Sequence, residues 1–293
     1  MIDGHVSQLG SSREVASAEW ARIFPDADHR WLMGLRPGNA KEFFASRDAT
    51  GSVCAQRAEF LDHEADKYAV LLPEAEPALR DTVELARTFG TSIDGAPTPF
   101  EQLLGLGRAW ESDFVWMHPA EDGTHHLIGG VVCFPSFWDV REKLGRPMSE
   151  IHEPVPGLNA ALGQKIETFL AALVPEVAWT REIAGYCRDS VLNHHPTRQF
   201  RPLDATVTTD EFWIRIEHQL LQRLAPSGSI LFGIRVEVFP LASLLADSQT
   251  ANRLARVLST MSPAAAAYKG LANARAQIVD LIRQSLVAHE TDA

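Results

Sequence analysis

The sequence predicts an α+β fold with a mainly antiparallel sheet, and two patterns carry this prediction. Apolar residues recur at spacings of three and four over residues 55–72 and 76–89, which is typical of amphipathic helices. Apolar and polar residues instead alternate over residues 212–217 and 230–238, which is typical of half-buried strands. The two kinds of segment occupy separate stretches of the chain, and this favours an α+β class over alternating βα units.

The first half of the chain is expected to begin as a flexible arm and to continue as helices. Residues 1–25 are assigned to the arm because the first twenty are small and polar, without a firm apolar period. Residues 26–293 are expected to form one domain. The helix over residues 76–89 should end at Gly90, and Thr98-Pro99-Phe100-Glu101 is a capping-box pattern that predicts the start of another helix.

The second half is expected to hold the sheet. Phe114–His118 and His126–Phe134 are β-prone and separated by turn residues, so they predict a hairpin. Ser136 is expected to cap a short helix. A proline-rich loop over residues 146–157 should lead into an amphipathic helix near residues 158–174. Two helices are expected to finish the chain, broken at Ser262-Pro263.

Composition excludes several classes of function. The chain has 293 residues and a formal net charge of −11, whereas a nucleic-acid surface needs basic patches. It has no run of about 18 apolar residues, so no membrane span is expected. The N-terminus lacks the basic start and apolar stretch of a signal peptide, and three scattered cysteines suit a reducing compartment. We therefore expect a cytoplasmic protein with neither nucleic-acid nor membrane partners.

Common catalytic signatures are missing from the sequence. It contains no G-x-S-x-G elbow, no P-loop and no H-E-x-x-H zinc pair. Two histidine pairs occur, His125-His126 and His194-His195. Adjacent side chains point in different directions, so we interpret these pairs as solvated loop histidines rather than chelating pairs.

His152 differs from the other histidines in its surroundings. It lies in Ile151-His152-Glu153-Pro154-Val155-Pro156-Gly157, where two prolines stiffen the backbone. A rigid loop can hold one imidazole at a fixed geometry, as a single axial ligand to a cofactor metal requires. The alternative is a loop histidine that hydrogen-bonds to the backbone.

Three charged side chains lie on otherwise apolar strands. Arg215 and Glu217 share one face of the first alternating segment, and Arg235 lies on the second. If these faces meet solvent, the residues are ordinary surface charges. If they line a cavity, the arginines suit carboxylates such as haem propionates, and Glu217 suits a cationic amine or guanidine. Periodicity does not distinguish these alternatives.

Taken together, several segments resemble the haem-dependent oxidative N-demethylase family, whose type member is the haem-binding alpha subunit of dimethylamine monooxygenase. The similarity runs from about residue 30 to about residue 270, and the ordered succession of motifs makes it specific. The matching segments are Val131-Val132-Cys133-Phe134-Pro135-Ser136, Glu142-Lys143-Leu144-Gly145-Arg146-Pro147, the His152 loop, Arg215-Ile216-Glu217-His218-Gln219, and the stretch from Leu224 to Arg235.

The resemblance implies a fold, a cofactor and site residues. The fold would be a PAS-like antiparallel sheet wrapped by helices, with helical N- and C-terminal extensions. Haem b would be bound, with His152 as the axial ligand of the iron and with Lys143 and Arg235 as candidate contacts for the propionates. Arg215 and Glu217 become the candidate catalytic residues. Should His152 not serve, His218 or a thiolate from Cys133 or Cys187 would be the alternative ligand.

This chain departs from the family pattern at three places. Thr180-Arg181-Glu182-Ile183 stands where the family carries Arg-x-Asn-Trp, and Glu217-His218-Gln219 stands where it carries Glu-Arg-Gln. Val236-Glu237 replaces a Thr-Tyr pair. These changes argue against dimethylamine as the substrate but leave the His152 loop intact.

The resemblance favours a haem enzyme that uses dioxygen to oxidise or cleave a C–N bond. Its substrate would be a small nitrogenous molecule: an amine, an amino acid, or an N-hydroxyguanidine such as N-hydroxyarginine, which yields hydroxyurea. The alternatives are a haem-based gas or redox sensor and a haem-free scaffold subunit. The sequence contains no flavin, nicotinamide or iron–sulfur motif, so electrons would come from a separate reductase or from the substrate.

Overall fold

The protein is described by a computed structural model that covers residues 16–93 and 95–291. Within this part of the chain, seven strands form one antiparallel sheet in the order β1-β5-β6-β7-β3-β4-β2. The strands are β1 Arg36–Gly38, β2 Ala69–Leu71, β3 Asp113–Pro119, β4 His125–Val131, β5 Ala178–Cys187, β6 Trp213–Arg223 and β7 Ile230–Pro240. The α+β prediction is confirmed, while the PAS-like designation stays a prediction.

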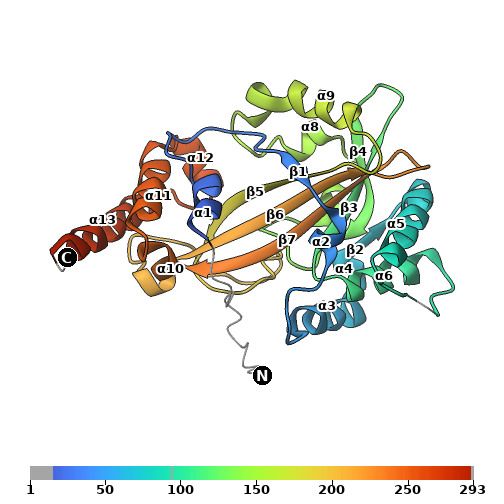
Figure 1. Ribbon diagram of the computed structural model, residues 1–293, viewed down its shortest axis with the longest axis horizontal. Helices are drawn as coiled ribbons and strands as arrows, with labels where there is room; N and C mark the ends of the chain where they lie inside the picture. The colour runs from blue at the N-terminus through green and yellow to red at the C-terminus, as the bar shows by residue number, and fades with distance from the viewer. Residues whose placement is uncertain (1–15, 94, 292–293) are drawn as a thin grey trace.

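Helices gather toward the two ends of the long strands β5, β6 and β7 (Figure 1). The N-terminal group is α2 Ala40–Phe44, α3 Ser52–His63, α4 Ala65–Tyr68, α5 Glu76–Thr88 and α6 Pro99–Ala109, with a 3₁₀ turn at Pro73–Ala75. The C-terminal group is α10 Leu241–Leu245, α11 Ser248–Thr260, α12 Pro263–Tyr268 and α13 Arg275–Thr291. Between them lie α7 Val140–Lys143, α8 Met148–Ile151, a π turn at Asn159–Gly163, α9 Gln164–Ala172 and a 3₁₀ turn at Thr209–Glu211.

The strand register divides the sheet into two faces. Opposite residues of paired strands share a face, and Arg181 lies opposite Gln219 while Glu182 lies opposite His218. We call the face with Arg181, Glu217 and Gln219 the inner face, and the face with Glu182, His218 and Arg235 the outer face. The alternation predicted for β6 and β7 is confirmed, and it places Arg235 on the face opposite Arg215 and Glu217.

Each face is covered by its own hydrophobic cluster. On the inner face, Val115, Met117 and Leu221 pack against Leu162 and Ile166 of the α9 region. On the outer face, one cluster joins Phe114, Trp116 and Leu231 to α5 and α6, and a second joins Ile214, Ile216 and Phe239 to α11 and α13. Burial of both faces stabilises the sheet and fixes its register.

The N-terminal part of the chain is more structured than the sequence indicates. Residues 1–15 of the expected arm lie outside the described residues. Residues 16–25, however, include helix α1, Ser17–Ile23, whose Trp20 is buried among Phe24 and Phe239. An apolar period this short is too weak to be recognised against the polar residues around it.

Some of the helix starts and ends predicted from local sequence patterns are confirmed, and others are wrong. The Thr98 capping box and the Gly90 stop are confirmed, since both capping hydrogen bonds form and Gly90 has φ of 90°. The single helix expected over residues 55–72 is wrong, because its end becomes β2 and pairs with β4. Ser136 does not cap a helix either; Asp139 caps α7.

None of the described helices combines the length and apolar character required to cross a bilayer.

Candidate functional site

A chain of hydrogen bonds runs across the inner face and has Glu217 at its centre. Arg215 Nε donates to Ser136 Oγ at 2.8 Å, and that hydroxyl donates to Glu217 Oε1 at 2.5 Å. Gln219 Nε2 donates to Glu217 Oε2 at 2.9 Å, and Arg181 Nε donates to Gln219 Oε1 at 2.7 Å. Both carboxylate oxygens are therefore held, so the orientation of Glu217 is fixed.

Ser136 is itself held by a strained turn. The next residue, Phe137, has φ of 64°, a left-handed conformation that side chains other than glycine rarely adopt. Phe137 N donates to His194 O at 3.0 Å, which ties this turn to the 190s loop. Such strain costs about 1–3 kcal/mol and persists only where the surroundings impose it, often at functional sites.

His152 lies near this hydrogen-bond chain, directly after α8. Its Nδ1 is buried and has no hydrogen-bond partner among the described residues. Burial, together with the nearby charges of Arg181 and Lys143, lowers the pKa of His152 to about 4. The imidazole is therefore neutral at pH 7 and keeps a nitrogen lone pair for a metal. A buried ring nitrogen without a partner does not fit a histidine that hydrogen-bonds to the backbone.

The end of α12 forms another wall of the site. Lys269 Nζ donates to Ala184 O at 2.7 Å and lies over the rings of Trp31 and Tyr186. Burial lowers the pKa of Lys269 to about 8, although the charge of Glu217 opposes this shift. Trp31 Nε1 donates to Pro156 O at 2.8 Å and so links Lys269 to the His152 loop.

The centre of the inner face is incompletely covered. Ile183, Glu217 and Val236 form one cross-strand row, and all three are half-buried. Ile216, which precedes Glu217 and lies on the outer face, is fully buried. Because β6 and β7 each have neighbours on both sides, the exposed surface of Glu217 and Val236 must come from a gap in the cover of the face. We infer a recess beside Glu217; Arg181 and Lys269 lie near its carboxylate, and His152 lies near Arg181.

Of the two alternatives for the strand charges, ordinary surface charge is wrong for both arginines. Arg215 is 1% exposed, and Arg235 is 4% exposed. Beyond Ser136, Arg215 donates to the carbonyl oxygens of Phe134 and Leu192, both at 2.7 Å. Arg215 therefore fastens two loops around Glu217; its predicted catalytic role stays a prediction.

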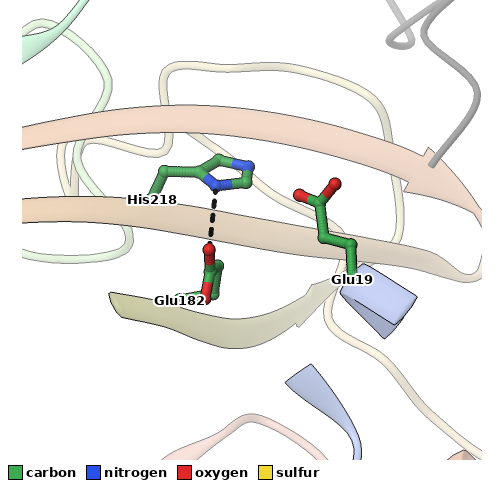
Figure 2. Close-up of side chains that lie close together, drawn as sticks. All are labelled: Glu19, Glu182 and His218. Carbon is green, nitrogen blue, oxygen red and sulfur yellow. Dashed lines mark ion pairs between the residues drawn. The ribbon is translucent and has the colours of Figure 1, made fainter. Parts of the chain in front are cut away.

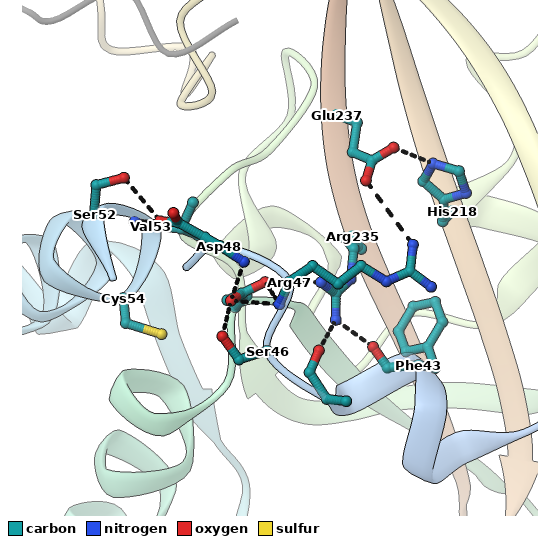
Figure 3. A network of polar contacts seen from close by, with 12 residues as sticks. Phe43, Ser46, Arg47, Asp48, Ser52, Val53, Cys54, His218, Arg235 and Glu237 are labelled. Carbon is teal, nitrogen blue, oxygen red and sulfur yellow. Dashed lines mark hydrogen bonds and ion pairs between the residues drawn. The ribbon is translucent and has the colours of Figure 1, made fainter. Parts of the chain in front are cut away.

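Arg235 is not brought to the recess. It lies on the outer face, where Nη1 donates to Glu111 Oε2 at 2.7 Å and Nη2 donates to the carbonyl oxygens of Phe43 and Ala45 (Figure 3). The sheet separates it from His152, because cross-strand alternation places Arg235 on the face opposite Arg215 and Arg181. Lys143, in contrast, lies near His152, and its side chain has no hydrogen bond or ion pair among the described residues.

The outer face carries a second polar cluster around His218. His218 Nε2 lies 3.0 Å from Glu237 Oε2, and its Nδ1 lies 3.9 Å from Glu182 Oε1. The carboxylates of Glu19 and Glu182 both turn toward the imidazole, and their ligand atoms with that of His218 lie within 4.8 Å of one another (Figure 2). This spacing would allow a metal ion.

Charge favours a proton over a metal in this cluster. Arg36 forms a two-bond ion pair with Glu182, and Arg47 lies 3.9 Å from Glu237. Two carboxylates, those of Glu182 and Glu237, thus lie next to the imidazole, and both attract a positive charge on His218. Burial lowers the pKa of His218, but the attraction of Glu182 and Glu237 outweighs it and raises the pKa above its ordinary value.

The remaining candidate ligands have other partners or the wrong protonation state. Burial raises the pKa of the Cys133 and Cys187 thiols to about 12, so neither is a thiolate at pH 7. The interpretation of the histidine pairs as solvated is wrong for three members. His125, His194 and His195 are buried, because each ring packs inside the fold next to a carboxylate: Glu167, Asp189 and Asp139, respectively.

One comparison with known proteins bears on this arrangement. A family model described as haem-dependent oxidative N-demethylase, alpha subunit-like, matches residues 86–279, which is more than half of the chain. The chain belongs to this family. The family's name states an oxidative and haem-dependent activity, and the matched range includes His152, Arg181 and Glu217 but excludes α1.

Two residues of the candidate site, Lys269 and Trp31, are ordinary residues of a helix end and a loop. Gln219, in contrast, lies in a segment that resembles the family. Arg181 could have been found from the strand pattern, since it lies opposite Gln219 on the face of Glu217. That inference required the register of β5, which depends on contacts between residues far apart in the sequence.

Proposed function

We propose that the chain is a haem-dependent oxidative enzyme that acts on a small nitrogenous substrate in the recess beside Glu217. The observation that carries this proposal is the buried Nδ1 of a neutral His152 that has no protein partner. Family membership supplies the expectation of haem, and this orphaned nitrogen fits it. In this proposal His152 holds the iron.

The charge of the recess also suits haem b. Three cations lie near His152 or Glu217: Arg181, Lys143 and Lys269. The charge of Glu217 acts on the pKa values of Arg181 and Lys269. Arg215 is a further cation near Glu217, so two propionates would offset part of the excess positive charge. Haem, when bound, supplies the oxidative chemistry with dioxygen.

Glu217 is proposed to bind the amine or guanidine group of the substrate. Its carboxylate is oriented by Ser136 and Gln219, and Arg215 fixes the Ser136 hydroxyl. A charge-assisted hydrogen bond from a substrate ammonium group would hold the nitrogen at one position on the inner face. The apolar neighbours Ile183 and Val236 would exclude water from the alkyl part of the substrate.

Electrons are proposed to come from a separate reductase or from a partly oxidised substrate such as an N-hydroxyguanidine. The choice between amine, amino acid and N-hydroxyguanidine belongs to the same proposal. A PAS-like sheet is likewise proposed on the family resemblance, and a cytoplasmic location is proposed on the few, scattered cysteines.

Absorption spectra of the purified protein test this function. We expect a Soret band in the ferric and ferrous protein, a ferrous–CO band typical of imidazole ligation, and a spectral shift when amines are added. A protein that stays colourless after addition of haem would contradict the proposal and favour a haem-free scaffold subunit. Haem binding without any response to nitrogenous ligands would favour a gas or redox sensor.

A further inference from the structure

Arg181 is a half-buried cation with unused hydrogen-bond donors. It projects from β5 onto the inner face, and its Nε donates to Gln219. Among the described residues, its two terminal nitrogens have neither a hydrogen bond nor an ion pair with the protein. Burial lowers the pKa of Arg181 to about 10 despite the charge of Glu217, which shows how little counter-charge the protein supplies.

The fully buried arginines have protein partners for their charge or their donors. Arg57 is paired with Asp113, Arg188 with Glu211, and Arg235 with Glu111. Arg215 donates hydrogen bonds to Ser136 and to backbone carbonyl oxygens. A desolvated cation is costly unless it is paired. Arg181 therefore has the features of a group whose partner is a ligand.

A second cation lies near His152. The charges of Arg181 and Lys143 both act on its imidazole. The side chain of Lys143 has no hydrogen bond or ion pair with another described residue. A ligand that enters next to His152 would thus meet a guanidinium group and an ammonium group.

We propose that Arg181, assisted by Lys143, binds a carboxylate of the ligand that occupies the recess. The inference rests on the proposed function, since it takes the recess to be the ligand site. The Nη1–Nη2 edge of a guanidinium group matches a carboxylate with two parallel hydrogen bonds. Two sources share this chemistry: a propionate of haem and the carboxylate of an amino-acid substrate.

The first arm of the test compares haem b with its dimethyl ester, which lacks both carboxylates. Soret titrations give the two affinities for the wild type, Arg181→Gln, Arg181→Lys and the control Arg146→Gln, whose side chain is exposed and paired with Glu150. If Arg181 binds a propionate, the wild type prefers haem by about 10- to 100-fold. Arg181→Gln loses most of this preference, Arg181→Lys keeps part of it, and Arg146→Gln keeps all of it.

The second arm tests the substrate as the source. Thermal stabilisation of the protein, with and without haem, is measured with glycine and with methylamine, which lacks the carboxylate. If Arg181 binds a substrate carboxylate, the wild type is stabilised more by glycine, and Arg181→Gln abolishes that difference while its haem-to-ester ratio is unchanged. Removal of a charge that has no ion-pair partner in the protein should not destabilise the fold, so the variant remains measurable.

The outcomes separate the two proposals. If Arg181→Gln behaves as the wild type in both arms, the inference is overturned, even when haem binds normally. If the wild type binds no haem, the proposed function fails, and the glycine comparison on the protein without haem still decides whether Arg181 binds a carboxylate.

Discussion

Asp113 shows how one buried carboxylate joins distant parts of the chain. It forms an ion pair with Arg57 of α3 and accepts hydrogen bonds from Cys133 N at 2.7 Å and Phe134 N at 2.9 Å. The segment it holds leads directly to Ser136, so this buried pair also supports the position of Glu217.

Asp113→Asn should destabilise the fold by about 3–5 kcal/mol, because it leaves the charge of Arg57 buried without its partner. The free energy of unfolding from urea titration measures the effect. The matched control is Asp62→Asn, whose partner Arg108 is at the surface, and its cost should be about 0–1 kcal/mol. Equal costs for the two variants would contradict a structural role for the buried pair.

Glu217→Gln should weaken the binding of amines by at least about 10-fold while the protein still binds haem, because the neutral amide cannot pair with an ammonium group. Spectral titration of the haem-loaded protein with methylamine measures this affinity. Glu121→Gln, in the exposed β3–β4 loop, serves as control. Unchanged amine affinity in Glu217→Gln would remove this residue from the substrate site.

For single residues, strand alternation predicts which side chains share a face of the sheet but not which residues they contact. It assigned Arg215 and Glu217 to one face, as observed. It could not show that Arg235 pairs with Glu111, because these residues are 124 positions apart. The unpartnered state of Arg181 is equally invisible, since it depends on the absence of contacts across the whole fold.

Helix α1 packs its one large apolar side chain into the C-terminal helical group. Trp20 is 4% exposed and contacts Phe24 and Phe239, so α1 belongs to the fold rather than to a free arm. Trp20→Ala should therefore cost about 3–5 kcal/mol of unfolding free energy. Phe100→Ala, at a partly exposed position of α6, is the control and should cost far less. A negligible effect of Trp20→Ala would mean that α1 is detached in solution.

The outer-face cluster predicts a pH dependence of stability. The folded-state pKa of His218 is raised, so its contribution is fully present below the unfolded value of about 6.5 and is lost as pH rises through the folded value. The charges that face it come from α1 (Glu19), β5 (Glu182) and β7 (Glu237), with Arg36 and Arg47 beyond them.

Urea titrations between about pH 6 and pH 9 check this prediction. The wild type should lose stability relative to His218→Gln as pH rises, since the variant has no proton to release. A constant difference across this range would show that His218 does not titrate. Stabilisation of the wild type by Zn²⁺, absent from His218→Gln, would show that the cluster binds a metal rather than a proton.

Among the elements, those with strong local signals were predicted and those defined by distant pairing were not. The capping box at Thr98 fixes the start of α6 from four consecutive residues. Strand β1 and strand β2 have three residues each and exist because β5 and β4 pair with them. The expected helix over residues 55–72 ends early for the same reason.

Over the whole molecule, the candidate site is assembled from parts of the chain that no local pattern connects. The inner face of β5 and β6 supplies Arg181 and Glu217, the loop after α8 supplies His152, and the end of α12 supplies Lys269. The sequence resemblance located His152 and Glu217. Only the folded sheet shows that Arg181 and Lys269 join them, while Arg235 does not.

The most direct test of the account is the absorption spectrum of His152→Ala after addition of haem, compared with the wild type and with His118→Ala. His118 is a half-buried imidazole whose pKa burial also lowers, but it bonds to Ser229 outside the recess. The account predicts that His152→Ala loses the Soret band or shows one that changes on addition of imidazole, while His118→Ala matches the wild type. A His152→Ala protein with the haem content and spectrum of the wild type would contradict it.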